Sequence, residues 1–127
     1  LISGGKETIL LVEDEPFVRE MVSKALRKMG YHLIIAEEGS VALRLADEYP
    51  DTIHLLLTDV VMPHMGGKEV AEQILLRRPG ISVLFMSGYT EDLVLRRAVR
   101  DQGVEFIAKP FTAKALAAKV RALLDKA

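Results

Sequence analysis

Short apolar runs alternate along the chain with longer segments in which apolar residues recur every three or four positions. Short runs of this kind are typical of buried strands, and the longer segments are typical of helices with one apolar face. The predicted strands are 9–12, 32–36, 54–58, 81–86 and 104–108. The predicted helices are 16–29, about 40–49, about 68–77, a fourth that begins at Thr90 and a fifth that begins at Thr112.

The boundaries and order of these elements predict how they assemble. Pro16 suits the first turn of a helix, and Gly30 suits its C-cap. The expected buried stripe of this first helix is Val18, Met21, Val22, Ala25, Leu26 and Met29. Five strand-then-helix units predict a parallel sheet covered by helices on both faces. The second strand is the most polar and is expected at an edge; the strand order 2-1-3-4-5 and a Rossmann-like half both satisfy these rules.

Composition narrows the class of protein. A chain of 127 residues favours one domain, and we interpret residues 1–6 as a linker remnant and 7–127 as the domain of a longer protein. The formal net charge of −1 gives no general attraction to nucleic acid or to an anionic membrane. No apolar stretch approaches the ~20 residues of a membrane span. The absence of cysteine excludes disulfides and thiolate metal sites, and it fits a cytoplasmic location.

Acidic and basic side chains stand at the ends of three predicted strands. Glu13, Asp14 and Glu15 follow the first strand, Asp59 follows the third, and Lys109 follows the last. Open α/β sheets place their ligands at the carboxyl ends of the strands, so we expect one site there. Clustered carboxylates repel one another unless a hard cation such as Mg²⁺ neutralises them.

The expected Mg²⁺ ligands are Asp14 and Asp59 directly, Glu13 through water, and the backbone carbonyl of Val61. The alternative is a solvated loop of acids with no ligand. Asp59 could also be a nucleophile, because carboxylates form aspartyl phosphates. In that case Lys109 would neutralise charge on the transferred group and Ser87 would donate a hydrogen bond to it.

Four motifs resemble those of a response-regulator receiver domain. The sequences are ETILLVEDEP at 7–16, LTDVVMPHMGG at 57–67, MSGY at 86–89 and KPF at 109–111. The resemblance covers about residues 7–125, and the sequence at 84–90 most resembles that of receivers fused to hybrid sensor histidine kinases. It implies a flavodoxin-like (CheY-like), doubly wound sheet of order 2-1-3-4-5 with five helices.

The resemblance also implies roles for individual residues. Asp59 would be the phosphoacceptor, with Glu13 and Asp14 as the acid pair and Lys109 as the site lysine. Ser87 would be the switch hydroxyl and Phe106 the switch aromatic, although phenylalanine lacks the hydroxyl that tyrosine supplies in many receivers. Tyr89 would form the pocket rim.

The resemblance further implies partners and leaves alternatives. The phosphoryl donor would be a sensor kinase phosphohistidine domain or a histidine phosphotransfer protein. The isolated domain would not be an enzyme beyond assisting its own phosphorylation and dephosphorylation. A stand-alone response regulator is one alternative to a C-terminal hybrid-kinase receiver. An aspartyl-phosphate phosphatase is another, although such enzymes typically carry Asp-x-Asp where this chain has Glu13-Asp14-Glu15. A phosphate-independent interaction module is the third.

Overall fold

The computed structural model describes residues 3–88 and 104–126. Its centre is a parallel sheet of five strands in the order β2-β1-β3-β4-β5, which decides between the two predicted arrangements. The strands are β1 (Thr8–Val12), β2 (His32–Ala36), β3 (Leu55–Asp59), β4 (Ser82–Ser87) and β5 (Val104–Ala108). The edge position predicted for the second strand is therefore confirmed.

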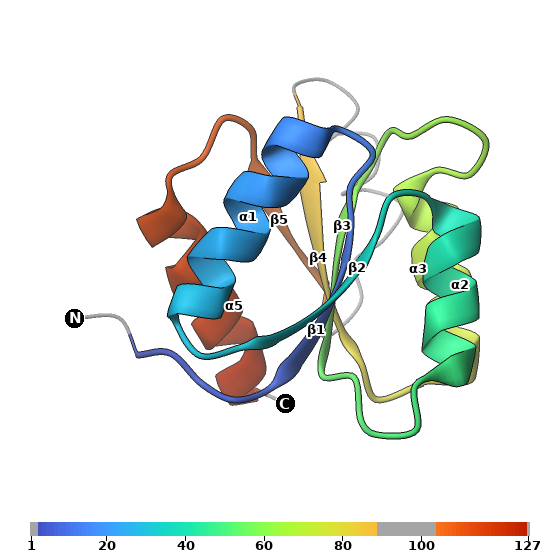
Figure 1. The fold of residues 1–127 in the computed structure, drawn as a ribbon, viewed down its shortest axis with the longest axis horizontal. Coiled ribbons are helices and arrows are strands. Elements are labelled where there is room, and N and C mark those ends of the chain that lie inside the picture. Colours follow the sequence, from blue (N-terminus) through green and yellow to red (C-terminus); the bar gives the residue numbers. More distant parts are fainter. Residues whose placement is uncertain (1–2, 89–103, 127) are drawn as a thin grey trace.

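Helices cover both faces of this sheet (Figure 1). In the part of the chain that the structure describes, the helices are α1 (Pro16–Lys28), α2 (Gly39–Glu48), α3 (Gly67–Arg77) and α5 (Ala113–Lys126). Figure 1 shows α1 and α5 on one face and α2 and α3 on the other. The helix predicted from Thr90 lies outside the described residues. None of these helices is long and apolar enough to cross a membrane.

The sheet divides the apolar core into two layers. All residues of β1, β3 and β4 are buried, because both faces of these central strands are covered. Leu10 and Val12 pack on the layer under α2 and α3, whereas Ile9 and Leu11 pack on the layer under α1 and α5. This alternation arises because successive side chains of a strand point to opposite faces of the sheet, and it determines which face each side chain of the strand occupies.

The first helix begins as predicted, but one expected buried residue is exposed. Glu15 caps α1 by accepting a hydrogen bond from the Phe17 backbone N–H at 3.4 Å, and Gly30 follows the helix with a left-handed φ of 99°. Met21 is 41% exposed, so its expected burial was wrong. Helical periodicity selects an apolar face that is wider than the strip that the sheet and α5 actually cover, and Met21 lies on its margin.

Strands β3 and β4 end one residue later than predicted, at Asp59 and Ser87. These two polar residues therefore belong to the ladder itself. Immediately afterwards the chain turns back so that Gly67, the first residue of α3, donates a backbone hydrogen bond to the Val60 carbonyl at 2.8 Å. A methyl group added at Gly67 would overlap the carbonyl oxygen of Asp59. The start of α3 is thus in direct contact with the backbone of the site.

Candidate functional site

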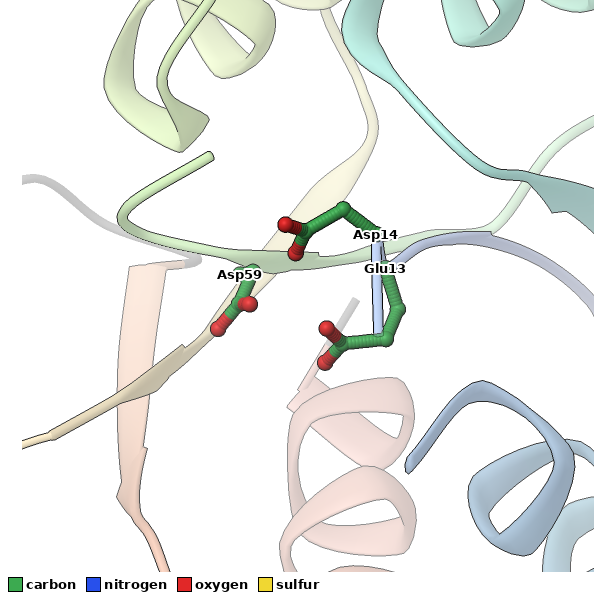
Figure 2. A group of neighbouring side chains, drawn as sticks. All are labelled: Glu13, Asp14 and Asp59. Atoms are coloured by element: carbon green, nitrogen blue, oxygen red, sulfur yellow. The ribbon is translucent and has the colours of Figure 1, made fainter. Parts of the chain in front are cut away.

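Three carboxylates meet at the carboxyl edge of the sheet, the upper edge in Figure 1. Glu13 and Asp14 come from the loop between β1 and α1, and Asp59 is the last residue of β3, the neighbour of β1. One carboxylate oxygen from each residue lies within 4.8 Å of those of the other two. Figure 2 shows the three side chains turned toward a common space. The predicted convergence of these acids at one edge of the sheet is therefore observed, and their role as a site stays a prediction.

The three acids differ in their exposure to solvent. Glu13 is fully buried, Asp59 is 8% exposed, and Asp14 is exposed. Glu13 accepts a hydrogen bond from the Glu15 backbone N–H at 3.1 Å, which folds the loop over its own side chain. The site therefore has two inner carboxylates and one that solvent can reach.

Among the described residues, Lys109 is the only cationic side chain that contacts these carboxylates. It follows β5, and its backbone N–H donates to the Ser87 carbonyl at 2.8 Å. Its Nζ atom donates to Asp59 Oδ1 at 2.7 Å and to Glu13 Oε1 at 3.2 Å. The peptide bond between Lys109 and Pro110 is cis.

The electrostatics of the site are unbalanced toward negative charge. Burial raises the pKa of Glu13 to about 7, with further contributions from its hydrogen bond with Asp59 and from the Asp59 charge. Burial disfavours the charged form of Lys109, but its hydrogen bond with Asp59 and the charges of Asp59 and Glu13 outweigh that effect and raise the lysine pKa. One ammonium therefore holds two inner carboxylates, and a proton or another cation would relieve the remaining repulsion.

Ser87 brings an unused donor to the same edge. Its side chain is fully buried at the end of β4, and its Oγ has no hydrogen-bond partner among the described residues. A buried hydroxyl without a partner costs free energy, so such a group is expected to have a use that the resting arrangement does not display. An oxygen-rich group bonded to Asp59 would supply an acceptor on the neighbouring strand.

The sequence that forms this site matches a family model. Residues 9–121 match the model described as "Response regulator receiver domain". This chain is a receiver domain of that family.

The relatives carry this domain in different settings. The chain is 38% identical to "Sensor kinase CckA" of Brucella abortus over 97% of its own length, but over only 13% of that protein. It is 32% identical to "Response regulator receiver protein CpdR" of the same species, over 91% of this chain and 95% of that protein. Several other curated relatives are matched over about half of their length. A crystal structure of the "receiver domain from Hybrid Histidine Kinase CckA" superposes with a TM-score of 0.78 at 33% identity, over 92% of this chain and 98% of that one.

Not every predicted site residue is placed by the structure. Val61 is 64% exposed beside the site, and the role of its carbonyl as a ligand stays a prediction. Tyr89 lies outside the described residues. Phe106 is buried in β5 and stacks on Phe85 of β4, with ring centroids 5.3 Å apart. Its packing in the core is therefore observed, and its role as a switch stays a prediction.

The receiver's donor set fits Mg²⁺. Receivers generally bind this ion, which prefers oxygen ligands and takes one or two protein carboxylates together with water and phosphate oxygens. Asp14 and Asp59 could bind it directly. Glu13 is buried and already accepts hydrogen bonds from Lys109 and from the Glu15 backbone N–H, and its indirect role stays a prediction.

Sequence reasoning missed one residue next to this site. Arg19 of α1 reaches back to the loop that carries Glu13 and Asp14 and donates to the backbone carbonyl of Glu13 at 2.9 Å. Its position five residues after Asp14, on the first turns of the helix, was the available signal. From the sequence alone, an arginine in the first turns of a helix is expected to be solvated. Its contact with the preceding loop becomes apparent only when the path of that loop is known.

Proposed function

We propose that this receiver accepts a phosphoryl group from a kinase phosphohistidine onto Asp59, with Mg²⁺ required. The observation that carries the proposal is the convergence of Asp59, two further carboxylates and the Lys109 ammonium at one edge of the sheet. Two buried acids share one ammonium here, and burial makes their mutual repulsion costly unless a further cation arrives. Membership of the receiver family supports the same reading.

In the proposed transfer, a carboxylate oxygen of Asp59 attacks the phosphorus atom of the phosphohistidine. An O–P bond forms as the P–N bond breaks, and the imidazole nitrogen departs with the electron pair of that bond and takes up a proton. Asp59 becomes an acyl phosphate. When bound, Mg²⁺ would neutralise charge on the transferred oxygens and on the carboxylates.

The chain's own residues would position and neutralise the new group. Lys109 already holds one oxygen of Asp59 at 2.7 Å, so its ammonium is within reach of a phosphoryl oxygen bonded to that carboxylate. Ser87 would donate its buried hydroxyl to another oxygen, which would satisfy its hydrogen bonding and draw the end of β4 toward Asp59. A hydrogen bond that Ser87 makes only when Asp59 is phosphorylated would favour one of two conformations of the domain over the other.

The donor needs a surface beside the site. A groove of about 400 Å³ is lined by Val18 and Met21 of α1, by Gly88, and by the segment 109–111. It is mainly apolar and reaches Lys109, so an apolar helix or loop of the donor seated there would lie next to Asp59. Phe17 on the same helix is 78% exposed and extends the apolar surface.

Two settings for the domain follow from its relatives. We infer that it is the C-terminal receiver of a hybrid sensor histidine kinase in the cytoplasm, because its similarity to sensor kinase CckA extends over 97% of the chain. A stand-alone regulator is the second candidate, favoured by the match to nearly the full length of CpdR. In either setting the domain assists its own phosphorylation and dephosphorylation and turns over no separate substrate.

The test is phosphorylation by a small donor. With acetyl phosphate and Mg²⁺, the domain should gain one base-labile phosphoryl group, and mass spectrometry after borohydride reduction should place it on Asp59. Asp59→Asn should abolish the label, whereas Asp51→Asn, which removes an exposed carboxylate before β3, should leave it unchanged. Labelling of Asp59→Asn at the wild-type level would refute the assignment.

A further inference from the structure

The side chain of Arg19 is bonded to the backbone of the acidic loop and not to a carboxylate. Its Nη1 donates to the Glu13 carbonyl at 2.9 Å and, at 3.5 Å, to the Asp14 carbonyl. The side chain is half-buried, and no ion pair of Arg19 with an acid is found among the described residues. An arginine that binds two successive carbonyls fixes a peptide segment in place.

The loop has few other attachments. The Glu13 N–H donates to the Ala36 carbonyl at 3.1 Å, which holds the start of the loop against β2. The Glu15 N–H donates to the Glu13 side chain, and Glu15 itself caps α1. The two carbonyls between these points are the ones that Arg19 binds. Without it, the peptide that joins the two acids would lose its contact with α1.

We propose that Arg19 is a positioning residue for metal binding: by holding the Glu13 and Asp14 carbonyls, it aims the two carboxylates at the cation. The proposal rests on the Mg²⁺ site of the proposed function. Residues that orient metal ligands without touching the metal change its affinity on the order of tenfold or more when they are removed. Arg19 would act in this way through backbone atoms.

A second role would have the opposite effect on affinity. A guanidinium bonded to the loop that carries two of the carboxylates also offsets part of their charge, and a cation there repels Mg²⁺. If Arg19 acted only as a charge, replacing it with neutral glutamine would strengthen Mg²⁺ binding. If it positions the loop, the same replacement weakens binding. The sign of the change therefore decides between the two roles.

The experiment measures the dissociation constant for Mg²⁺ from backbone amide shifts in nuclear magnetic resonance titrations of the intact domain. The variants are Arg19→Gln, Arg19→Lys and the control Arg27→Gln, which removes the same charge from an exposed residue about 12 Å further along α1. We expect a dissociation constant raised about tenfold in Arg19→Gln and changed less than twofold in Arg27→Gln. Arg19→Lys should fall between Arg19→Gln and wild type, because lysine can reach one carbonyl but cannot reproduce the planar donor group.

The outcomes are separable from loss of folding and from failure of the proposed function. Partial unfolding lowers the amplitude of the amide signals, whereas mispositioned ligands move the midpoint of the titration. Unchanged or tighter binding in Arg19→Gln, or wild-type binding in Arg19→Lys, would overturn the positioning role while leaving the Mg²⁺ site standing. Failure of the wild-type domain to bind Mg²⁺ would overturn both.

Discussion

The two ends of strand β1 carry the same pair of charges and use them differently. Glu7 lies just before the strand, and Glu13 lies just after it. Each is paired with a cation from the last part of the chain: Arg121 of α5 contacts Glu7, and Lys109 contacts Glu13. At the amino end the hydrogen bonds are complete, whereas at the carboxyl end they are not.

Arg121 also contacts two acids at the amino end, but the second of them, Asp125, is exposed to solvent. Arg121 donates to both oxygens of Glu7, at 3.2 and 2.7 Å, to Asp125 at 3.0 Å, and also to the Tyr31 hydroxyl and the Gly4 carbonyl. The hydrogen bond from Arg121 lowers the pKa of Glu7. At the carboxyl end one lysine serves two buried acids, the pKa of Glu13 is raised to about 7, and the Ser87 hydroxyl has no partner among the described residues.

The difference is one of burial: both acids that Lys109 contacts are buried, whereas one of the two acids that Arg121 contacts is exposed. Under the proposed function, the buried group of charges receives a ligand and the other only stabilises the fold. A satisfied pair gains nothing from a further ion. An unsatisfied one lowers its free energy when a cation and a phosphoryl group arrive. Four experiments test this difference between the two ends of β1.

The first experiment removes each of the two cations in turn, and we expect its effect to be the greatest of the four. Lys109→Gln should slow phosphoryl labelling on the order of 100-fold, because it removes a charge placed where negative charge develops. Arg121→Gln should change the labelling rate less than about twofold but lower the free energy of unfolding by about 1–3 kcal/mol, since it leaves Glu7 without its partner. Rates are followed by mass spectrometry and stability by urea unfolding. Equal slowing in both variants would remove the distinction between the two ends.

The second experiment uses pH, and the two glutamates should act with opposite signs. The pKa of Glu13 in the metal-free fold, about 7, exceeds its ordinary value of 4.5, so the folded protein retains a proton that the unfolded chain has released. Stability from this group is present below pH 4.5 and is lost as the pH rises to about 7, by about 3 kcal/mol. Glu13→Gln should remove that decline.

The pKa of Glu7 is lowered, so its contribution is present above pH 4.5 and is lost as the pH falls through the lowered folded value. Glu7→Gln should therefore remove stability at neutral pH and flatten the acid side of the curve. Both curves are measured by urea unfolding without divalent ions. A Glu13 variant that retains the decline between pH 4.5 and 7 would assign that decline to another group.

The third experiment separates the acids within the loop. Asp14→Asn should weaken Mg²⁺ binding at least about tenfold, or 1.4 kcal/mol, because Asp14 is a predicted direct ligand. Glu15→Gln should have less effect, because Glu15 lies outside the carboxylate cluster and caps α1 instead. Without metal, Asp14→Asn should also melt at a higher temperature, since it removes a repelling charge. Titration and thermal melting measure these effects, and equal losses of affinity would indicate diffuse attraction by surface charge.

The smallest effect concerns the two ends of β4. Ser87→Ala removes a buried hydroxyl that has no partner in the described structure, so the metal-free domain should keep its stability or gain up to about 1 kcal/mol. The same substitution should abolish the amide shift changes that phosphorylation causes at Phe106. Ser82→Ala, at the other end of the strand, should leave those changes intact. A Ser87 variant that responds normally would exclude the hydroxyl as the link between Asp59 and β5.

Sequence patterns predicted the features that depend on residues close together in the sequence. They missed the contacts between residues that are far apart in the sequence. The strands were located to within one residue, and the acids and lysine of the site were identified because each follows an apolar run. The full burial of Glu13 was not foreseen, because the loop closes over it only through contacts made by its own backbone and by Lys109. The pair Glu7 and Arg121, 114 positions apart, leaves no local pattern at all.

Glycine 67 shows how closely the scaffold and the chemistry share space. Helix α3 begins so near to the end of β3 that no side chain fits at position 67, whereas Gly80, before β4, has open space around it. A library of all substitutions should therefore treat two glycines of the same short crossover very differently, accepting many residues at 80 and almost none at 67. Intolerance at 67 would then show that the start of α3 cannot be moved by a point mutation without also moving Asp59.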